Sequence, residues 1–217
     1  VSALLSCVST SCVASGDAGP APQAQIFQSS SKGSNVNLSA GRSITLGSTA
    51  SYRQITLGDN STAVFSDQQG NYFIDSLVTG NAVLLSMAPG NYWVRNMALG
   101  SNNRIQVSGS GSVRLFVYDS TISGGGLLAN SPAAGATGVI GALLLYGYGD
   151  ITLGSSTTFS GLLFAGGNFT LGSSSDLFGA VTAANLLVNA DSKVYYSPAS
   201  VLDIDFGSLC SGASCDL

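Results

Sequence analysis

The side chains that could act as acids, bases or metal ligands in this sequence are few. All 11 acidic residues are Asp, 7 residues are Lys or Arg, and there is no His. Without His there is no Ser/His/Asp or Cys/His triad, no imidazole general base and no His-ligated zinc or haem. The net charge of −4 also argues against the basic surface that nucleic acid requires. Most enzyme templates are therefore excluded, and nucleic acid is not expected as a partner.

Acid–base chemistry would have to come from Asp. Polysaccharide hydrolases of the β-helix class use clustered carboxylates, and lyases of that shape add Arg, Lys or bound calcium. The best local candidate is Asp203 with Asp205, whose spacing puts both carboxylates on one face of a strand. This pair follows the last repeat, in a segment interpreted as a terminal cap. We therefore expect no catalytic residue, no metal and no cofactor, with an Asp-based hydrolase or lyase as the alternative.

Cysteine could supply metal ligands or disulfides, and its four copies lie at the two ends of the chain. Both pairs have the spacing C-x4-C, at Cys7/Cys12 and Cys210/Cys215. Four thiols allow three pairings, and a zinc site is the alternative, although zinc knuckles usually use C-x2-C. The flanking Ser, Gly and Ala are typical of loops. We expect disulfides, of open connectivity, and therefore an oxidising, extracytoplasmic compartment.

A repeat runs through the rest of the chain, which is rich in Ser, Thr, Val and Gly and poor in helix-forming residues. Ile-Thr-Leu-Gly occurs at 44–47, 55–58 and 151–154, Phe-Thr-Leu-Gly occurs at 169–172, and looser copies lie between and after them. The apolar anchors of these copies are Leu46, Leu57, Val78, Leu99, Ile122, Leu153, Leu171 and Val188. Self-similarity at about 20 residues predicts stacked units.

The residue three places before each anchor supports this alignment, because it was not used to find it. It is Asn or Asp in six of eight copies: Asp75, Asn96, Asp119, Asp150, Asn168 and Asn185. Such side chains tolerate the left-handed conformation of a corner and can hydrogen-bond to the equivalent side chain one unit away. We expect these residues to form a structural corner ladder.

The repeat predicts an all-β fold, a single-stranded parallel β-helix (β-solenoid) of roughly seven to eight coils with disulfide-bonded ends. A β-sandwich of hairpins is the competitor, but it explains neither the period nor the corner. The expected organisation is an extended lead-in and N-terminal cap over 1–42, the repeat domain over 43–196 with a loop insertion near 124–140, and a C-terminal cap over 197–217. The insertion centres on 131–138, and Leu46 would belong to the N-terminal cap.

Four side chains in the repeats are candidates for ligand contact. Tyr146 and Tyr148 alternate around Gly147 and could present their rings for stacking on sugars. Arg95 and Arg114 could contribute to a weak cationic strip. The structural alternatives are that the tyrosines pack and that the arginines are solvated. A Thr ladder suited to ice binding is broken at Leu77, Ala98 and Leu187.

The motifs of the later repeats resemble a known family. Residues 143–153, 161–171 and 179–185, together with 90–94, 113–117 and 205–210, are similar to the repeat region of MshQ-like proteins, encoded with the mannose-sensitive haemagglutinin (MSHA) type IV pilus of Gram-negative bacteria. The likeness covers about residues 43–210. The family often has Asn-Ser-Asn after the anchor, where this chain has Gly-Ser-Ser. The resemblance implies a surface or pilus-associated, adhesive module and supplies no catalytic residue.

Taken together, these observations predict a non-enzymatic, secreted or cell-surface bacterial module with a structural or adhesive role. Its expected partners are pilus or other surface proteins and glycans. Self-association through the coil ends, giving a filament subunit, is a further alternative. No membrane span is expected, because no stretch reaches the roughly 18 uninterrupted apolar residues that a bilayer requires.

Overall fold

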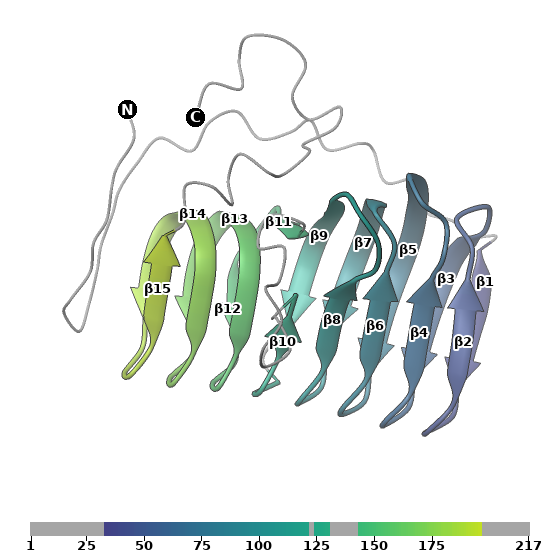
Figure 1. The fold of residues 1–217 in the computed structure, drawn as a ribbon, viewed down its shortest axis with the longest axis horizontal. Helices are drawn as coiled ribbons and strands as arrows, with labels where there is room; N and C mark the ends of the chain where they lie inside the picture. Colours follow the sequence, from purple (N-terminus) through teal and green to yellow (C-terminus); the bar gives the residue numbers. More distant parts are fainter. Residues whose placement is uncertain (1–32, 122–123, 131–142, 197–217) are drawn as a thin grey trace, which may run out of the picture.

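The chain folds into a parallel β-solenoid of about seven turns, as the computed structural model shows (Figure 1). The structure describes residues 33–121, 124–130 and 143–196. This part of the chain contains no helix, and so none that is long and apolar enough to cross a membrane. The predicted all-β, parallel β-solenoid is therefore confirmed, whereas the disulfide-bonded ends stay a prediction. The β-sandwich alternative is wrong because every strand pair of the described residues is parallel.

The described residues form fifteen strands of the solenoid. Their bounds are β1 Ser34–Leu38, β2 Ser43–Leu46, β3 Ser51–Leu57, β4 Thr62–Phe65, β5 Gly70–Thr79, β6 Leu84–Met87, β7 Gly90–Ala98, β8 Arg104–Val107, β9 Val113–Thr121, β10 Leu128–Ala129, β11 Leu143–Gly147, β12 Ile151–Leu153, β13 Thr158–Leu171, β14 Asp176–Val188 and β15 Lys193–Tyr196. Each strand pairs with the equivalent strand one coil away, because no coil can satisfy its own backbone groups or bury its own apolar side chains.

The pairing divides the solenoid into three faces. Face A consists of β2, β4, β6, β8, β10, the first residues of β13 and β14, and β15. Face B consists of the start of β3, residues 70–74, 90–94 and 113–117, β11, and residues 161–165 and 179–183. Face C consists of β1, residues 54–57, 76–79, 96–98 and 119–121, β12, and residues 168–171 and 185–188. Each coil thus contributes one short strand to each face.

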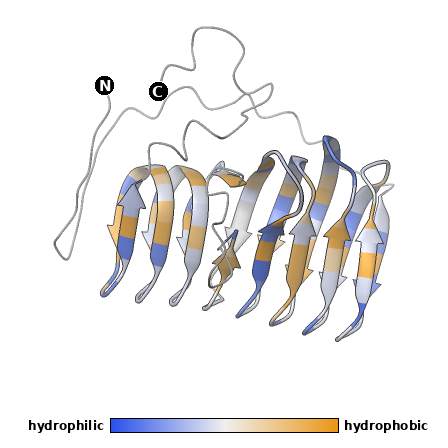
Figure 2. Cartoon of the chain, viewed as in Figure 1, coloured by the Kyte–Doolittle hydropathy of each residue, from blue (hydrophilic) through white to orange (hydrophobic). Residues whose placement is uncertain are grey.

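Alternation along each strand creates the core, and Figure 2 shows hydrophobic residues alternating with paler or hydrophilic ones. On face B the inward Tyr72 and Tyr92 are fully buried and stack with ring centroids 4.6 Å apart. Phe65 of face A meets Tyr92 edge-on at 5.4 Å. Inward Leu, Ile, Val and Phe from all three faces join these rings in one continuous cluster. Aromatic stacking along the axis therefore ties successive coils together.

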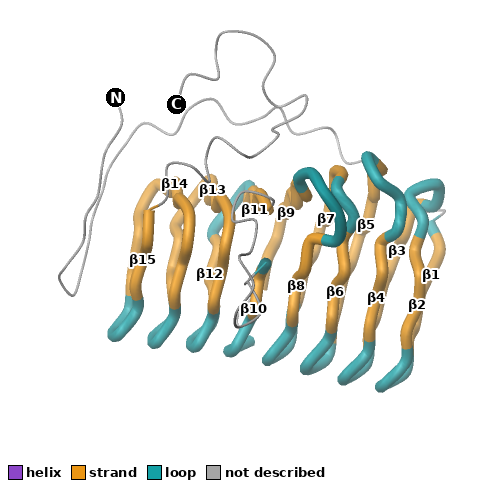
Figure 3. Tube along the Cα trace, in the orientation of Figure 1, coloured by secondary structure: helices purple, strands orange, loops and turns teal. Residues whose placement is uncertain are grey.

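A sharp turn joins face C to face A in every coil, and these turns line up along one edge of the rod (Figure 3). Each contains a residue with positive φ, between 55° and 74°, at the same place in the coil: Gly41, Asn60, Ala82, Asn102, Gly126, Ser156, Ser174 and Asp191. The inward residue after it is often polar and buried, as at Ser61, Asn103 and Thr157. Ser61 Oγ donates to Gly58 O at 2.6 Å, and Thr157 Oγ1 donates to Gly154 O at 2.7 Å. These side chains satisfy carbonyl groups that the turn leaves unpaired.

The register differs from the predicted one in the unit at 70–79. Leu57 pairs with Thr79, not with Val78, so Ser76 occupies the corner position and pairs with Asn96. Asp75 is therefore not a member of the corner column. Thr79 is 6% exposed, and its hydroxyl accepts hydrogen bonds from Asn103 Nδ2 at 2.6 Å and from Gly100 N at 3.2 Å. The anchor position of this coil is thus buried but occupied by the polar Thr79. An alignment that looks for an apolar anchor therefore selects Val78, one residue too early.

The first coil also starts earlier than predicted. Leu46 lies on face A beside Phe65, whereas the face C equivalent of Leu57 is Leu38. The two similar tetrapeptides at 44–47 and 55–58 thus belong to different faces, and the first described strand, β1, already begins at Ser34, before the predicted boundary at 42/43. Leu46 is part of a coil rather than of a cap.

The expected insertion begins later than residue 124. β10 pairs with both β8 and β13, so it is a regular part of face A. Residues 131–138, the cysteines Cys7, Cys12, Cys210 and Cys215, and the pair Asp203 and Asp205 lie outside the described residues.

The corner ladder between faces B and C is confirmed only in part. Asn185 Nδ2 donates to Asn168 Oδ1 at 2.8 Å, and Asn168 N donates to Asp150 Oδ1 at 2.7 Å. Asp119 pairs with Asn96 through the backbone. The expected left-handed conformation is wrong for the described members of this column, because the positive φ values belong to the turn between faces C and A. This turn reverses the chain more tightly than the gentle bend between faces B and C, which runs within continuous strands.

Candidate functional site

Five aromatic rings lie in one row on the outward side of face B. The pairing register puts them next to one another on successive strands, and we call the row the aromatic ladder: Phe73, Trp93, Phe116, Tyr146 and Phe164. Trp93 and Phe116 stack with centroids 4.1 Å apart, and Tyr146 and Phe164 stack at 4.3 Å. Phe116 and Tyr146 join the two pairs at 6.0 Å. An outward row of rings is unusual for a solvated sheet face, which is normally polar.

Strand alternation explains why these rings point outward. In each unit three apolar residues follow one another, as in Tyr72, Phe73 and Ile74. The first and third are buried in the core, so the second must point to the other side of the sheet. The same holds for Trp93 between Tyr92 and Val94. The core register therefore fixes the position of the ladder.

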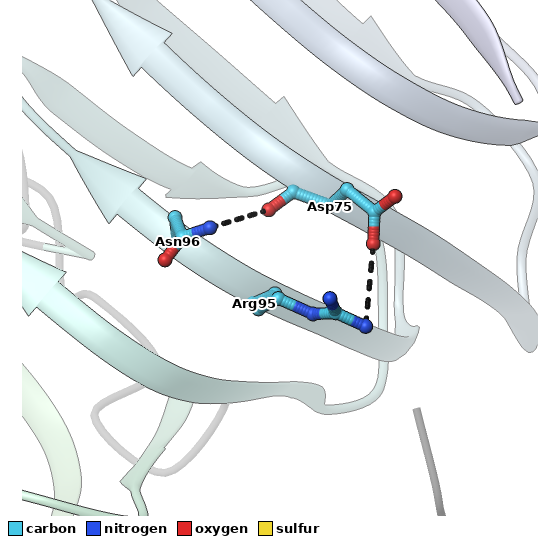
Figure 4. A network of polar contacts seen from close by, with 3 residues as sticks. All are labelled: Asp75, Arg95 and Asn96. Carbon is cyan, nitrogen blue, oxygen red and sulfur yellow. Dashed lines mark hydrogen bonds and ion pairs between the residues drawn. The ribbon is translucent and has the colours of Figure 1, made fainter. Parts of the chain in front are cut away.

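A second row runs beside the ladder at the corner between faces B and C. It consists of Asp75, Arg95, Tyr118 and Tyr148, and we call it the corner row. Arg95 Nη2 lies 3.7 Å from Asp75 Oδ1, and Asn96 Nδ2 donates to the Asp75 carbonyl oxygen at 3.3 Å (Figure 4). The rings of Tyr118 and Tyr148 stack at 4.5 Å. Tyr148 also meets Tyr146 edge-on at 4.9 Å, which connects the corner row to the ladder.

A polar row borders the other side of the ladder. Asn91 Nδ2 donates to Asn71 Oδ1 at 2.8 Å, and Arg114 Nε donates to Asn91 Oδ1 at 2.6 Å. Further along the axis Leu144 and Leu162 take the equivalent positions. The ladder thus has hydrogen-bonding groups on both sides over its first coils and an apolar border over its later coils.

Two buried polar atoms of this surface form no hydrogen bond within the described part of the chain. They are the hydroxyl of Tyr146 and the Oδ1 atom of Asp75, which has only the long ion pair with Arg95, whereas the Tyr148 hydroxyl is paired with that of Tyr118. Buried polar atoms are almost always paired, so such atoms call for a partner. Burial raises the pKa of Tyr146 to about 12. Burial also raises the pKa of Tyr148, and the neighbouring Tyr118 and Tyr146 add to the effect. Both phenols are neutral donors at physiological pH.

Accessibility varies along the surface. Trp93, Phe116 and Tyr146 are 7%, 1% and 4% exposed, whereas Phe73, Phe164, Tyr118 and Tyr148 are partly exposed. Asp75 and Arg95 are partly exposed as well. The accessible part is therefore the corner row and the two ends of the ladder, with the unpartnered hydroxyl of Tyr146 at its floor.

This arrangement suits stacking and hydrogen bonding rather than bond cleavage. Aromatic faces pack against the C–H faces of ring-shaped ligands, and phenol, amide and guanidinium groups pair with hydroxyls. Glycoside cleavage would need two opposed carboxylates a few ångströms apart. Asp75 is the one carboxylate of the corner row, and it faces Arg95. Over the described ranges 33–121, 124–130 and 143–196, no three acidic or Cys side chains converge as a metal site requires.

The structure brings together the four residues that the sequence singled out for ligand contact. Tyr146, Tyr148, Arg95 and Arg114 all lie on or beside face B. Sequence reasoning missed the rest of the surface: Phe73, Trp93, Phe116, Phe164, Tyr118, Asn71 and Asn91. A signal was present, because an aromatic residue stands in the middle of several apolar triplets, but hydropathy alone does not say which member of a triplet faces outward.

Comparison with known proteins gives a family match. A family model described as "Domain of unknown function (DUF7305)" matches residues 11–200, which include all of the described coils. No curated protein and no solved structure matches the chain.

Proposed function

Since the chain belongs to the DUF7305 family, a domain of unknown function, we propose that it is a non-enzymatic module of the bacterial cell surface that binds a neutral glycan over the aromatic ladder and the corner row. The solenoid acts as a rigid support, and its outward face B supplies the contacts. Because the described coils stack in register, the surface repeats along the axis and suits an extended, repetitive ligand.

The observation that carries this proposal is the buried, unpartnered hydroxyl of Tyr146 beside the stacked rings of Phe164 and Tyr148. Sugar hydroxyls both donate and accept hydrogen bonds, so they can satisfy phenol groups that the protein leaves unpaired. The C–H face of the same sugar can pack on the ring of Tyr118 or Tyr148.

Charge favours a neutral ligand. Arg95 faces Asp75, and Arg114 is turned toward Asn91, so the cations of this surface are already engaged. An anionic polymer would need cations that are free to pair with it. The overall charge of −4 adds to this argument.

A glycan array followed by titration calorimetry tests the proposal. Trp93 is the single Trp of the chain and belongs to the ladder, so its fluorescence reports binding at this site. Tyr148→Phe and Tyr146→Phe remove one hydroxyl each and keep the ring. We expect each to weaken binding by roughly 5–10-fold, the effect of one hydrogen bond. Tyr195→Phe is the matched control, because Tyr195 lies on face A and stacks on Phe178 at 4.7 Å.

Two outcomes would overturn the proposal. Binding that Tyr148→Phe and Tyr195→Phe change equally would place the ligand elsewhere. Release of reducing sugar that Asp75→Asn abolishes would make the protein an enzyme and support the hydrolase or lyase alternative.

The surface location rests on cysteine usage and on the resemblance to MshQ-like proteins, which also suggests association with a pilus or another surface appendage. We expect Cys7, Cys12, Cys210 and Cys215 to be disulfide-bonded in the protein as secreted. Mass spectrometry after alkylation, with and without prior reduction, tests this. Alkylation of all four thiols without reduction in secreted material would contradict it.

A further inference from the structure

The surroundings of the Tyr146 hydroxyl decide which chemical group can pair with it. The Tyr146 side chain is 4% exposed, and its hydroxyl has no hydrogen-bond partner among the described residues. Its ring stacks on that of Phe164 with centroids 4.3 Å apart, meets Tyr148 edge-on at 4.9 Å and lies 6.0 Å from Phe116. The hydroxyl is thus a polar group on a ring whose described neighbours are aromatic.

This hydroxyl is available as a donor. Burial raises the pKa of Tyr146 to about 12, so the phenol stays protonated at neutral pH. The neighbouring Phe rings carry no acceptor, and the Tyr148 hydroxyl is already paired with that of Tyr118. A ligand that completes the site therefore has to bring an acceptor to Tyr146.

An acetamido group fits this position better than a sugar hydroxyl does. A hydroxyl carries a donor as well as acceptors, and leaving its donor unpaired among aromatic rings costs free energy. The carbonyl oxygen of an acetamido group is only an acceptor, and the adjoining methyl group can pack on the rings. Because the amide is planar and trans, its N–H points away from the carbonyl and so away from the aromatic floor. All polar atoms are then satisfied.

The size of the opening also favours a small, flat group. The hydroxyl is buried beside Tyr148, whose side chain is partly exposed. Side chains at the surface change rotamer rapidly, so Tyr148 can turn enough to admit a flat substituent. The sugar ring that carries this substituent stays outside, over the partly exposed rings of Tyr118 and Tyr148.

A second unpaired atom indicates the direction in which the ligand runs. Asp75 Oδ1 is buried and takes part only in the 3.7 Å ion pair with Arg95. Asp75 and Tyr146 belong to coils that are three strand pairings apart on face B, a separation of about 14 Å at the strand spacing of a sheet. One sugar cannot contact both residues, so a ligand that satisfies both is an oligomer along the rod axis.

We propose that the glycan bound at face B is a neutral oligomer of N-acetylhexosamine that lies along the rod axis and places one acetamido carbonyl on the hydroxyl of Tyr146. The inference rests on the proposed function and narrows its ligand class. The sugar rings pack on Tyr118 and Tyr148, and a hydroxyl toward the other end donates to Asp75 Oδ1. Tyr146 is thus the residue that determines specificity for the N-acetyl group.

Pairs of glycans that differ only at C2 test the proposal. The β-1,4-linked tetramers of N-acetylglucosamine and of glucose are one pair, and oligomers of N-acetylgalactosamine and of galactose are a second. Titration calorimetry uses the full chain, and circular dichroism confirms that each variant is folded. We expect the acetylated member of at least one pair to bind roughly tenfold more tightly, and Tyr146→Phe to reduce this preference roughly fivefold or more. Tyr195→Phe, on face A, is the matched control and should keep the preference.

The results separate this proposal from the one on which it rests. Equal affinity for both members of each pair would overturn the N-acetyl assignment and leave the glycan site in place. A preference that persists in folded Tyr146→Phe would assign it to another residue. A monosaccharide that binds as tightly as its tetramer would contradict the axial placement. If no sugar of the glycan array binds, the proposed function itself fails.

Discussion

The indole ring of Trp93 stacks on the ring of Phe116 one coil further along, with centroids 4.1 Å apart and planes inclined by 15°. Both rings point out of the solenoid, whereas the residues on either side of each point into the core. Stacked aromatic pairs add about 0.5–1.5 kcal/mol beyond the area that they bury. The ladder therefore connects the coils on the outside as Tyr72 and Tyr92 do on the inside. A binding surface built on such a row is rigid along the axis, which lowers the entropic cost of holding a ligand.

Tyr146 of the ladder predicts that the free energy of unfolding falls at alkaline pH. Burial raises the pKa of Tyr146 from 10 to about 12. The neutral phenol is thus favoured in the folded protein. Its contribution to the free energy of unfolding is fully present below pH about 10 and is lost as the pH rises toward about 12. We expect the free energy of unfolding to fall between these values and Tyr146→Phe to reduce the fall. Urea denaturation at a series of pH values measures it, with Tyr195→Phe as the exposed control. An equal fall in both variants would contradict the assignment.

The buried side chain of Asn103 predicts a large loss of stability on substitution. Its Nδ2 atom donates to Thr79 Oγ1 at 2.6 Å and to Gly100 O at 3.1 Å, and its Oδ1 atom accepts from Val83 N at 2.7 Å. Asn103→Ala leaves a buried backbone N–H without a partner, and we expect a cost of about 1–3 kcal/mol. Chemical denaturation compares it with Asn37→Ala, at an exposed position of face C. Similar losses in the free energy of unfolding for Asn103→Ala and Asn37→Ala would show that the buried hydrogen bonds of Asn103 add no stability.

Much of the fold was predictable from the sequence because the solenoid repeats the same local choices. The period, the parallel class and the hydrogen-bonded Asn column all follow from residues such as Asn168 and Asn185, which recur at fixed distance from an apolar anchor. The register at 70–79 was not predictable in this way. Thr79 occupies an anchor position, and its burial depends on Asn103 from the next coil. A long-range hydrogen bond of this kind leaves no trace in local hydropathy.

The candidate site was predictable only at Tyr146, Tyr148, Arg95 and Arg114. The rest of the aromatic ladder lies in apolar triplets, in which every residue looks suitable for a core. Only the strand register decides that Trp93 faces outward while Tyr92 faces inward. The positive-φ residues in the turns between faces C and A were not predictable for a different reason. They include Ala82 and Ser156, which do not favour positive φ in isolation.

Close backbone contact between coils predicts that Gly90 cannot carry a side chain. A Cβ atom at Gly90 would lie 2.6 Å from the carbonyl oxygen of Gly70, its partner in the neighbouring coil. Relief would require the two strands to move apart, and we expect Gly90→Ala to cost about 1–3 kcal/mol. Gly149→Ala is the control, because its nearest neighbour, Tyr118 O, lies at 3.8 Å. Thermal denaturation of the two variants compares them, and equal midpoints would refute the steric explanation.

Ala82 predicts the opposite effect, a gain of stability on substitution by Gly. Its φ is 55°, in the left-handed region where a Cβ atom is unfavourable, and Gly41 and Gly126 occupy the equivalent turns of other coils. Gly also loses more conformational entropy on folding than Ala, which opposes the relief of strain. The left-handed penalty of about 1–2 kcal/mol exceeds the entropic cost of about 0.5–1 kcal/mol. We therefore expect Ala82→Gly to raise the free energy of unfolding by about 0.5–1 kcal/mol.

The control is Ala98→Gly, within β7. It should lower the free energy of unfolding instead, because a strand residue gains nothing from access to positive φ. Urea denaturation of both variants decides the matter, since a loss of stability at both positions would mean that entropy dominates at the turn.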